Sequence, residues 1–427
     1  MVLLATLATF IVLLLLSLPI VFALGAAAVV GLLTAGLPLQ QLGSTLVTSS
    51  QNWVLLAIPS FVFAGSLMER AGMSTALVEL ARALVGWVRG GLGMSVIVVS
   101  YFFSDICGSK MAEVSALGSA LMPSLKKAGY RAEDGASLIA AGTAMGMLVP
   151  PAIFMIVISE VTNQSAVALF LAGFIPAAVI GAILCLLVLI QAHILGWPAD
   201  TRTSFRRIFG ALKNAAVPLV IPFVILGGFY AGAFTATEAG AIVALYAFIA
   251  AKFYYRNVSW REIFDLAYEA GVLTSVVIYL LAVATIFQYL LGISGAPEFF
   301  GRMLAPLEGQ HWLFLTGVAA MTMLFGMVLE GLPAAVVLIP VVFPIATKIG
   351  VQPVHFDIVQ TAAVGIGLFT PPLGVGLLMA LRFAEISVGQ HIRAYVPYLL
   401  ALLLGLMLII CVPEFSLFLP RSAGLIR

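Results

Sequence analysis

Charged residues are scarce in this sequence. Lys, Arg, Asp and Glu make up 9% of the 427 residues and hydrophobic residues 63%, whereas a soluble domain has roughly 25% charged residues. The net charge of +2 is too small to suggest binding to nucleic acid. Three cysteines, Cys107, Cys185 and Cys411, lie far apart, so neither a disulfide framework nor a metal site is expected. The four histidines show no ligand spacing, and neither HExxH nor GxSxG occurs, which argues against an enzyme.

What fills the sequence is a series of long apolar runs. Segments that approach or exceed the ~18 apolar residues of a spanning helix are 2–24, 167–192, 216–233, 236–251 and 395–412. We therefore expect an all-α protein that crosses a membrane many times. The first run follows Met1 without a basic region or a small-residue cleavage pattern, which favours a retained helix over a cleaved signal peptide.

Basic residues gather in three clusters between these runs. Cytoplasmic loops carry excess Lys and Arg, and two apolar crossings separate each cluster from the next, so all three are expected on the cytoplasmic side. The clusters are Lys126, Lys127 and Arg131; Arg202, Arg206, Arg207 and Lys213; and Lys252, Arg256 and Arg261.

The sequence contains an internal repeat. Residues of the first half recur 221 positions later, and this constant register favours a duplication. The matching pairs are Pro123 and Pro344, Lys127 and Lys348, Gly129 and Gly350, Gly146 and Gly367, Pro150-Pro151 and Pro371-Pro372, and Pro176 and Pro397. Counting the crossings between the halves places the second half in the opposite orientation, which is the inverted repeat of many secondary transporters.

Each half is expected to contain a re-entrant hairpin. The apolar segments 92–103 and 114–124 flank the polar stretch SDICGSK, and each would span ~17 Å of a hydrocarbon core about 30 Å thick. Residues 92–124 are therefore expected to enter and leave on the cytoplasmic side, and residues 312–347 to enter from the outside. Irregular backbone is tolerated at that depth only where it is buried in protein or lines a cavity.

Each half also contains a helix that is expected to break at mid-membrane. The stretches GTAMGMLVPP and AVGIGLFTPP lie in the predicted helices 135–163 and 355–385, and each ends in two prolines, which remove two amide donors. A broken helix leaves carbonyl oxygens for a cation and a half-helix N-terminus for an anion. Two breaks in repeat register, beside two hairpins, predict a site at mid-membrane for an organic anion and small cations.

The expected organisation follows from these segments. Amphipathic stretches at 74–91 and 297–307 are expected to lie at the membrane interface as arm helices before the hairpins. The four regions are residues 1–50, the N-terminal scaffold helices; 51–200, the first inverted repeat; 201–260, a cytoplasmic basic loop and a linking helix pair; and 261–427, the second inverted repeat.

Several motifs resemble the large membrane subunit of tripartite ATP-independent periplasmic (TRAP) transporters, the dicarboxylate-transporter M family. They are GSxxAExxALGSxLxPxxKKAGY at 108–130, PPxIxM at 150–155, ALFLAGFIP at 168–176, VxPVHFxIV at 351–359 and GLxTPPxG at 367–374. The resemblance covers essentially the whole chain. It implies an elevator-type, sodium-driven importer of organic acids in the bacterial inner membrane, with Na⁺ as coupling ion and no other cofactor. It also implies two partners, a small four-helix membrane subunit and a periplasmic substrate-binding protein.

The resemblance also implies which residues form the site. In this family the hairpin tips and the broken helices hold sodium and cradle the substrate. Carried over to this sequence, the site residues are Cys107, Gly108, Ser109, Thr143 and Gly146 in the first repeat and Glu330, Gly331, Gly365, Gly367 and Thr370 in the second, with helix breaks at Pro150, Pro151, Pro371 and Pro372.

Some positions depart from the family pattern. The family commonly has Ser where this chain has Cys107, Thr-Thr where it has Gly331-Leu332, and often Asn where it has Ala363. Several side-chain oxygens expected to hold sodium are therefore missing, and backbone carbonyls would have to replace them.

Lys110, where the family has a small residue, has two interpretations. A lone cation at the centre of a bilayer costs at least ~2.5–3.5 kcal/mol, so it needs a partner. Its ammonium group could stand where a sodium ion would, or meet a substrate carboxylate. Alternatively, it pairs with Asp105 or with Glu113, which lies at the helical spacing i+3, and only staples the hairpin.

Three other functions compete with the TRAP interpretation. A stand-alone sodium/carboxylate symporter would share the architecture but would need no binding protein. An ion channel could use the broken helices, although inverted hairpins at a constant repeat offset favour alternating access. A purely structural scaffold would not need irregular backbone at mid-membrane.

Overall fold

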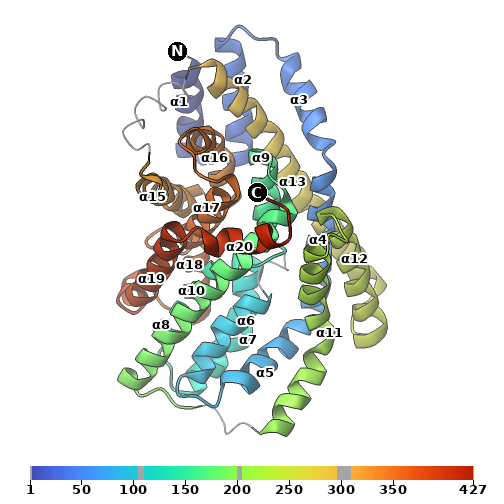
Figure 1. Ribbon diagram of the computed structural model, residues 1–427, viewed down its shortest axis with the longest axis vertical. Helices are drawn as coiled ribbons and strands as arrows, with labels where there is room; N and C mark the ends of the chain where they lie inside the picture. The colour runs from blue at the N-terminus through green and yellow to red at the C-terminus, as the bar shows by residue number, and fades with distance from the viewer. Residues whose placement is uncertain (1, 104–109, 200–203, 296–308, 330, 427) are drawn as a thin grey trace.

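All regular elements are helices in the part of the chain that the structure describes (Figure 1). The computed structural model describes residues 2–103, 110–199, 204–295, 309–329 and 331–426. Within these ranges, eight helical segments are long and apolar enough to cross a membrane. The prediction of an all-α, polytopic membrane protein is confirmed.

The N-terminal apolar run, predicted as one segment at 2–24, is instead two helices. Helices α1 (Val2–Leu15) and α2 (Ile20–Thr34) pack against each other, and Pro19 stands at the N-cap of α2. Proline has no amide proton and its ring clashes with the preceding turn, so the run breaks there.

A group of helices, called the scaffold below, occupies the top and right of the molecule in Figure 1. The long helix α13 packs against α2, α3 and α4 and so connects the N-terminal helices to the rest. The scaffold consists of α1, α2, α3 (Gln40–Ser50), the 3₁₀-helix η1 (Trp53–Leu56), α4 (Ala57–Arg70), α11 (Phe205–Tyr230), α12 (Ala236–Ile249), the π-helical turn η2 (Ala250–Tyr255) and α13 (Trp260–Ile293).

The predicted arm helix at 74–91 is α5 (Met73–Val85), which ends earlier than expected because the chain turns after Gly86. It begins after Gly72, whose φ of 76° is a left-handed conformation that glycine adopts readily. The buried side of α5 packs against α11. The second predicted arm helix, 297–307, lies outside the described residues.

The remaining helices form two sets in the same order: two hairpin helices, two halves of a broken helix and a long closing helix. The first set is α6 (Gly91–Phe103), α7 (Lys110–Lys127), α8 (Ala132–Gly146), α9 (Ile153–Thr162) and α10 (Ala166–Leu195). The second set is α15 (His311–Leu329), α16 (Gly331–Lys348), α17 (Pro353–Leu368), α18 (Val375–Ala384) and α19 (Val388–Cys411), followed by α20 (Glu414–Ser422).

The helix boundaries repeat at the spacing found in the sequence. Helices α7 and α16 begin at Lys110 and Gly331, which are 221 residues apart, and α8 and α17 begin at Ala132 and Pro353, at the same spacing. From α9 to α18 the spacing grows by one residue. Both halves of the chain therefore fold into the same succession of helices.

The hairpin helices are longer than the apolar segments suggested. Helix α7 has 18 residues, because its polar first turn is helical too, whereas α6 has 13. In the second hairpin, α15 has 19 residues and α16 has 18, and each meets the length and composition of a spanning helix. By length alone, α6 of the first hairpin is too short to span a membrane, whereas both helices of the second hairpin are long enough.

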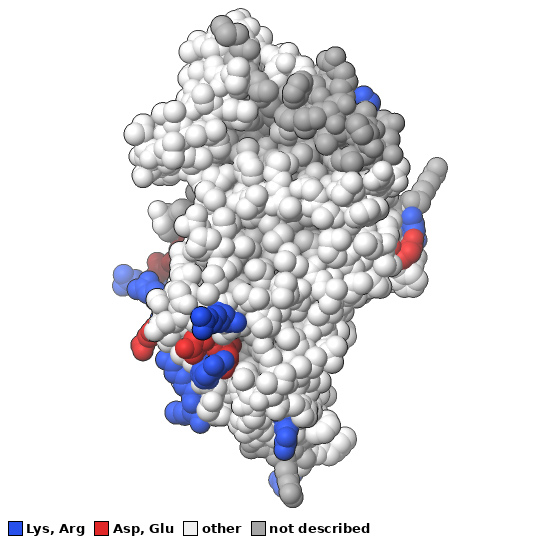
Figure 2. Space-filling model, turned by 90° about the vertical axis from the view of Figure 1, so that its left-hand side faces the viewer, with Lys and Arg blue, Asp and Glu red and all other residues white. Residues whose placement is uncertain are grey.

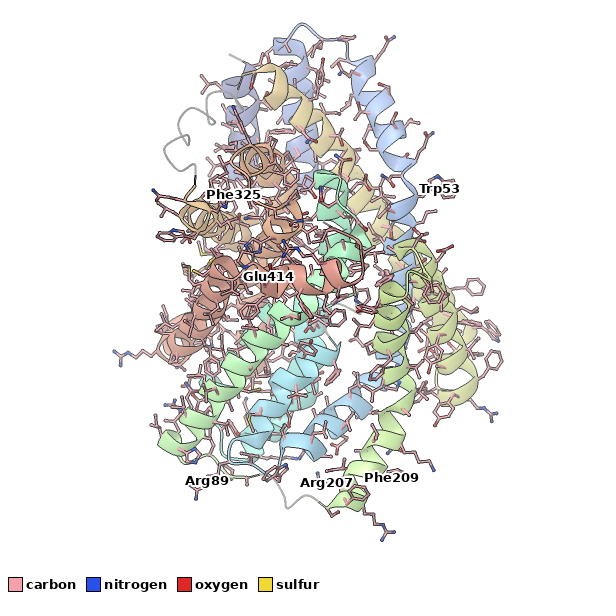
Figure 3. The ribbon with its side chains drawn as sticks, viewed as in Figure 1. Trp53, Arg89, Arg207, Phe209, Phe325 and Glu414 are labelled. Carbon is pink, nitrogen blue, oxygen red and sulfur yellow. The ribbon has the colours of Figure 1, made fainter. Side chains whose placement is uncertain are left out.

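Charged side chains are sparse on the face of the molecule that Figure 2 shows. Most of those on this face gather at its lower left, and the broad area beside them is uncharged. Arg89, beyond α5, and Arg207, in the first turn of α11, lie at the same end of the molecule (Figure 3). A backbone hydrogen bond of 3.1 Å from the Gly90 amide to the Pro198 carbonyl holds the two chain segments together there.

Gly173 of α10 provides a test of how the first repeat packs. A Cβ at Gly173 would lie 2.1 Å from the Leu148 carbonyl oxygen, whereas a Cβ at Gly227 of α11 would meet no atom within 4 Å. We expect Gly173→Ala to destabilise the protein by about 1–3 kcal/mol through overpacking, and Gly227→Ala to leave its stability unchanged or slightly raised. Thermal unfolding of the two purified variants measures the difference. Equal melting temperatures would contradict the placement of α10 against the connection between α8 and α9.

Candidate functional site

Both predicted helix breaks are present. The connection between α8 and α9, residues 147–152, contains the double proline 150–151, and the connection between α17 and α18, residues 369–374, contains the double proline 371–372. Prolines supply no amide donor, so neither helix continues through the pair. The first connection is buried, whereas the second is partly exposed, with Leu373 at 53%.

Each hairpin packs on the broken helix of the other repeat as well as on its own. Helix α7 contacts α8 and α18, and α16 contacts α17 and α9. The approach of α7 to α18 is close, because a Cβ at Gly118 would lie 2.7 Å from the ring of Phe383. The two repeats therefore cover each other's breaks and form one body around them.

The two broken helices cross at equivalent residues. A Cβ at Gly365 of α17 would lie 2.6 Å from the carbonyl oxygen of Ala144 in α8, and these residues are 221 positions apart in the sequence. A close contact between equivalent residues is what a two-fold axis between the repeats produces. Glycine is required at position 365, because a larger residue would push the helices apart.

Part of the predicted site lies together around this crossing. A Cβ at Gly331, the first residue of α16, would lie 3.2 Å from the side chains of both Met147 and Val364. Thr143 and Gly146 are buried on α8 in the turns beside the crossing. The beginning of α16, the second helix of this hairpin, therefore reaches the first break.

Other predicted residues make packing contacts instead. A Cβ at Gly367 would lie 2.5 Å from the carbonyl oxygen of Met323 in α15, so this glycine lets α15 and α17 approach each other. The Thr370 hydroxyl donates to the Ile366 carbonyl at 2.8 Å. The predicted site residues that lie outside the described residues are Cys107, Gly108, Ser109 and Glu330.

Lys110 forms an ion pair with Glu113 in the first turn of α7. The Nζ and Oε2 atoms are 2.8 Å apart, and both side chains are buried. Of the interpretations raised by the sequence, this geometry matches the one in which the lysine pairs within its own hairpin. The equivalent positions in the second repeat are Gly331 and Ala334, so the two hairpins differ in charge.

Two buried hydroxyl groups near the first break have no hydrogen-bond partner in the described part of the chain. They belong to Ser100 of α6 and Thr143 of α8. A Cβ at Gly142 would lie 2.6 Å from the Ser100 oxygen, so that hydroxyl faces α8. A buried polar group left unpaired costs ~1–3 kcal/mol. A ligand that binds these two oxygens would remove that cost, so both are candidate ligand atoms. The sequence analysis missed Ser100, although it is a polar residue inside an apolar hairpin segment.

The second repeat lacks these hydroxyls. The residues equivalent to Ser100 and Thr143 are Met321 and Val364. In the described ranges no group of three or more His, Cys, Asp or Glu side chains could hold a metal ion. The ligands offered near the first break are therefore hydroxyl oxygens and the carbonyl oxygens of the unwound connection, which suit a small monovalent cation such as Na⁺.

Two hairpins and two broken helices around one crossing are the architecture of many polytopic membrane transporters. Comparison with known families gives a narrower assignment. The chain belongs to the tripartite ATP-independent periplasmic transporter family, DctM component, whose family model matches residues 7–415. It is a multi-pass inner-membrane protein, the large permease subunit of a TRAP transporter, and not an enzyme.

Individual relatives agree with this assignment. The chain is 34% identical over 388 residues to the C4-dicarboxylate TRAP transporter large permease protein DctM of Pseudomonas aeruginosa, with 90% of each chain covered. It is 33% identical over 393 residues to the isethionate TRAP transporter permease protein DctMQ of Oleidesulfovibrio alaskensis, covering 92% of this chain and 62% of that protein. The crystal structure of the Alcanivorax borkumensis YdaH transporter has a similar fold, with a TM-score of 0.59 and 17% identity over 87% of this chain and 88% of that one.

A double-mutant comparison tests the ion pair of the first hairpin. We expect Lys110→Met alone to destabilise the protein by about 3–5 kcal/mol, because it removes the ion-pair partner of a buried carboxylate. Adding Glu113→Gln should recover most of that loss. Thermal unfolding of the single and the double variant measures both effects. If the double variant is destabilised as much as Lys110→Met alone, the pairing is contradicted. If the double variant also transports with the same ion dependence as the wild type, the ammonium group does not act as an ion substitute.

Proposed function

We propose that this chain imports a small organic acid anion by secondary active transport, with Na⁺ as the coupling ion and an elevator movement as the mechanism. The observation that carries the proposal is the crossing of two broken helices at Ala144 and Gly365, with the unpaired hydroxyls of Ser100 and Thr143 buried nearby. Half-helix N-termini favour a carboxylate, and unwound carbonyls favour a cation.

The names of the relatives support a small organic anion as the substrate. One relative is named for C4-dicarboxylates and another for isethionate, so a carboxylate and a sulfonate occur among the substrates of similar proteins. We infer an organic acid for this chain and expect the choice among organic acids to depend on the partner that delivers it.

We expect two partner proteins, because transporters of this family are tripartite. One would be a small membrane subunit and the other a periplasmic substrate-binding protein. The relative named DctMQ is longer than this chain, which spans 62% of it. The alternative is a stand-alone symporter. A transport assay from which each partner is omitted in turn would reveal it, because uptake would then persist.

Apolar cavities between the hairpins and the scaffold support an elevator movement. A cavity of about 690 Å³ separates the second hairpin from α1, with Phe325 of α15 (Figure 3) and Phe10 in its wall. A smaller one, of about 100 Å³, lies where Tyr101 and Phe102 at the end of α6 face Phe223 of α11. Apolar surfaces can slide past each other without breaking hydrogen bonds, which supports a movement of both hairpins against the scaffold.

A polar contact also crosses this boundary. Asn52, the N-cap residue of η1 in the scaffold, donates a hydrogen bond from its amide to the carboxylate of Glu160 in α9. An elevator movement of α9 relative to η1 would have to break this contact in every cycle.

Uptake into proteoliposomes tests the function directly. With both partners present, we expect uptake of at least one of a panel of carboxylates and sulfonates when a sodium gradient is imposed, and little uptake without the gradient. Uptake that persists without the binding protein would favour a stand-alone symporter, and a sustained current uncoupled from substrate would favour a channel.

Substitution of Thr143 tests the proposed sodium site. We expect Thr143→Val to raise the sodium concentration for half-maximal uptake by about fivefold to 150-fold, because the loss of one buried oxygen ligand costs ~1–3 kcal/mol. Thr48→Val serves as the control, since Thr48 is exposed on α3. The same sodium dependence in both variants would remove Thr143 from the site.

Cross-linking tests the elevator movement. In a chain without its native cysteines, Asn52→Cys and Glu160→Cys would be joined by a short bifunctional thiol reagent, and we expect uptake to stop and to return when the linker is cleaved. The control pair is Trp53→Cys and Thr237→Cys, which lies within the scaffold, where the Thr237 hydroxyl donates to the Trp53 carbonyl at 2.9 Å. Full uptake by the cross-linked Asn52–Glu160 pair would rule out relative movement at this boundary.

A further inference from the structure

Helix α17 carries a second set of buried polar residues, which the candidate site above does not use. Asp357, Gln360 and Thr361 are all 0% exposed. They lie within about one helical turn of each other, on the N-terminal side of the crossing at Gly365, and eight residues of helix put Asp357 about 12 Å from that crossing. The residue equivalent to Asp357 in the first repeat is Ala136, so this carboxyl group is a property of the second repeat.

The carboxyl group of Asp357 has little to balance a negative charge. One oxygen, Oδ2, contacts the hydroxyl of Thr162 at the end of α9, at 2.8 Å. The other, Oδ1, is buried and has no hydrogen-bond partner among the described residues. No Lys or Arg in the described ranges forms an ion pair with it. A buried carboxylate without a cationic partner is strongly disfavoured, and such a group binds a proton instead.

The hydrogen bonds of Thr162 lead to the same conclusion. Its hydroxyl oxygen lies 2.8 Å from Asp357 Oδ2 and 2.9 Å from the Ile158 carbonyl oxygen, but a hydroxyl has only one proton to donate. If Asp357 were ionised, one of these two contacts would join two acceptors. If Asp357 is protonated, it donates to Thr162, which donates to Ile158, and both contacts are hydrogen bonds.

Gln360, one turn along α17, can serve the ionised form of the same group. Its carbonyl oxygen accepts a hydrogen bond from Thr322 of α15, while its amide nitrogen is buried and has no partner among the described residues. An unused donor therefore lies one turn from the unused acceptor Oδ1. Once the proton leaves, Thr162 can donate to the carboxylate instead of to Ile158, and the unused Gln360 amide lies one turn away on the same helix.

Several other titratable groups on and around α17 contact polar side chains of their own, whereas the buried Tyr395 hydroxyl of α19 has no partner among the described residues. His355 of α17 contacts the Ser416 hydroxyl at 3.3 Å, His391 of α19 contacts the Ser137 hydroxyl at 2.9 Å, and Asp134 of α8 pairs with Arg131. Glu160 of α9 accepts from Asn52. The helices that pack against α17 carry eight further charged or imidazole side chains. Glu133 of α8 is half-buried, and the others are exposed: His193, His311, Lys348, Arg382, Arg393, Glu414 and Arg421.

We propose that Asp357 is a buried proton-binding site, formed with the Thr162 hydroxyl and the Gln360 amide, and that its proton is exchanged during the transport cycle. The site joins the outer half of one broken helix, α9, to the first turns of the other, α17. An elevator movement carries both helices together, so proton exchange requires a local shift of α9 against α17 that takes Thr162 away from the carboxyl group and changes its affinity for the proton. The binding of the proton stands independently of the transport role; the link to the cycle rests on the proposed function.

Infrared spectroscopy of the purified full-length permease, with its small subunit, tests proton binding without any transport. We expect a carbonyl stretching band of a protonated carboxyl group that shifts in D₂O and is lost in Asp357→Asn, which keeps the size and neutrality of the protonated form. Asp265→Asn is the matched control, because Asp265 is exposed on α13, and it should keep the band. Gln360→Leu should keep the band to higher pH, since it removes a donor that serves the ionised form. Identical spectra for the wild type and Asp357→Asn between about pH 5 and about pH 8 would overturn the proposal.

Uptake by the same variants tests the link to the transport cycle. We expect wild-type uptake to depend on pH and this dependence to be lost in Asp357→Asn but kept in Asp265→Asn. The same pH dependence in wild type and Asp357→Asn would overturn proton exchange during the cycle. A failure of the proposed transport function would show first, as an absence of uptake by the wild type under every gradient, and the infrared result would still decide whether Asp357 binds a proton.

Discussion

Backbone amide and carbonyl groups that leave a helix inside a membrane must find partners within the protein, because hydrocarbon offers none. The two double prolines impose this constraint twice, and much of the structure responds to it. Helix α10 approaches the first break so closely that only glycine fits at Gly173. Hairpin helices α7 and α16 each cover part of both repeats. Two irregular segments at this depth are possible because the halves of the chain shelter each other.

The two repeats share the same succession of helices, but their buried polar side chains differ. Equivalent helices begin 220–222 residues apart. The first repeat nevertheless holds the Lys110–Glu113 pair and the unpaired Thr143 hydroxyl, where the second has Gly331, Ala334 and Val364. Conversely, the second repeat buries Asp357 where the first has alanine. The duplicated framework therefore carries two different polar sets, while the crossing at Ala144 and Gly365 keeps the two halves in contact.

Much of this architecture was predictable, because membrane helices are punctuated by residues with strong local effects. The double prolines, the recurring glycines and the lengths of the apolar runs located the hairpins and the breaks. The errors also have local causes. Pro19 divides a run that hydrophobicity alone presents as one segment, and α7 extends over a polar turn because Lys110 and Glu113 neutralise each other. Ser100 was missed because a single hydroxyl in an apolar helix gives no periodic signal.

The sequence by itself determined that this protein is helical, spans a membrane, is built from two related halves and belongs with the TRAP permeases, because composition, proline spacing and motifs act through short-range chemistry. Only the tertiary structure decided which polar groups meet. Ala144 and Gly365 touch, Asp357 reaches Thr162, and Ser100 faces α8 across gaps of tens to hundreds of residues. Such contacts depend on how whole helices pack, and no local pattern encodes whether a buried hydroxyl or carboxyl group will find a partner.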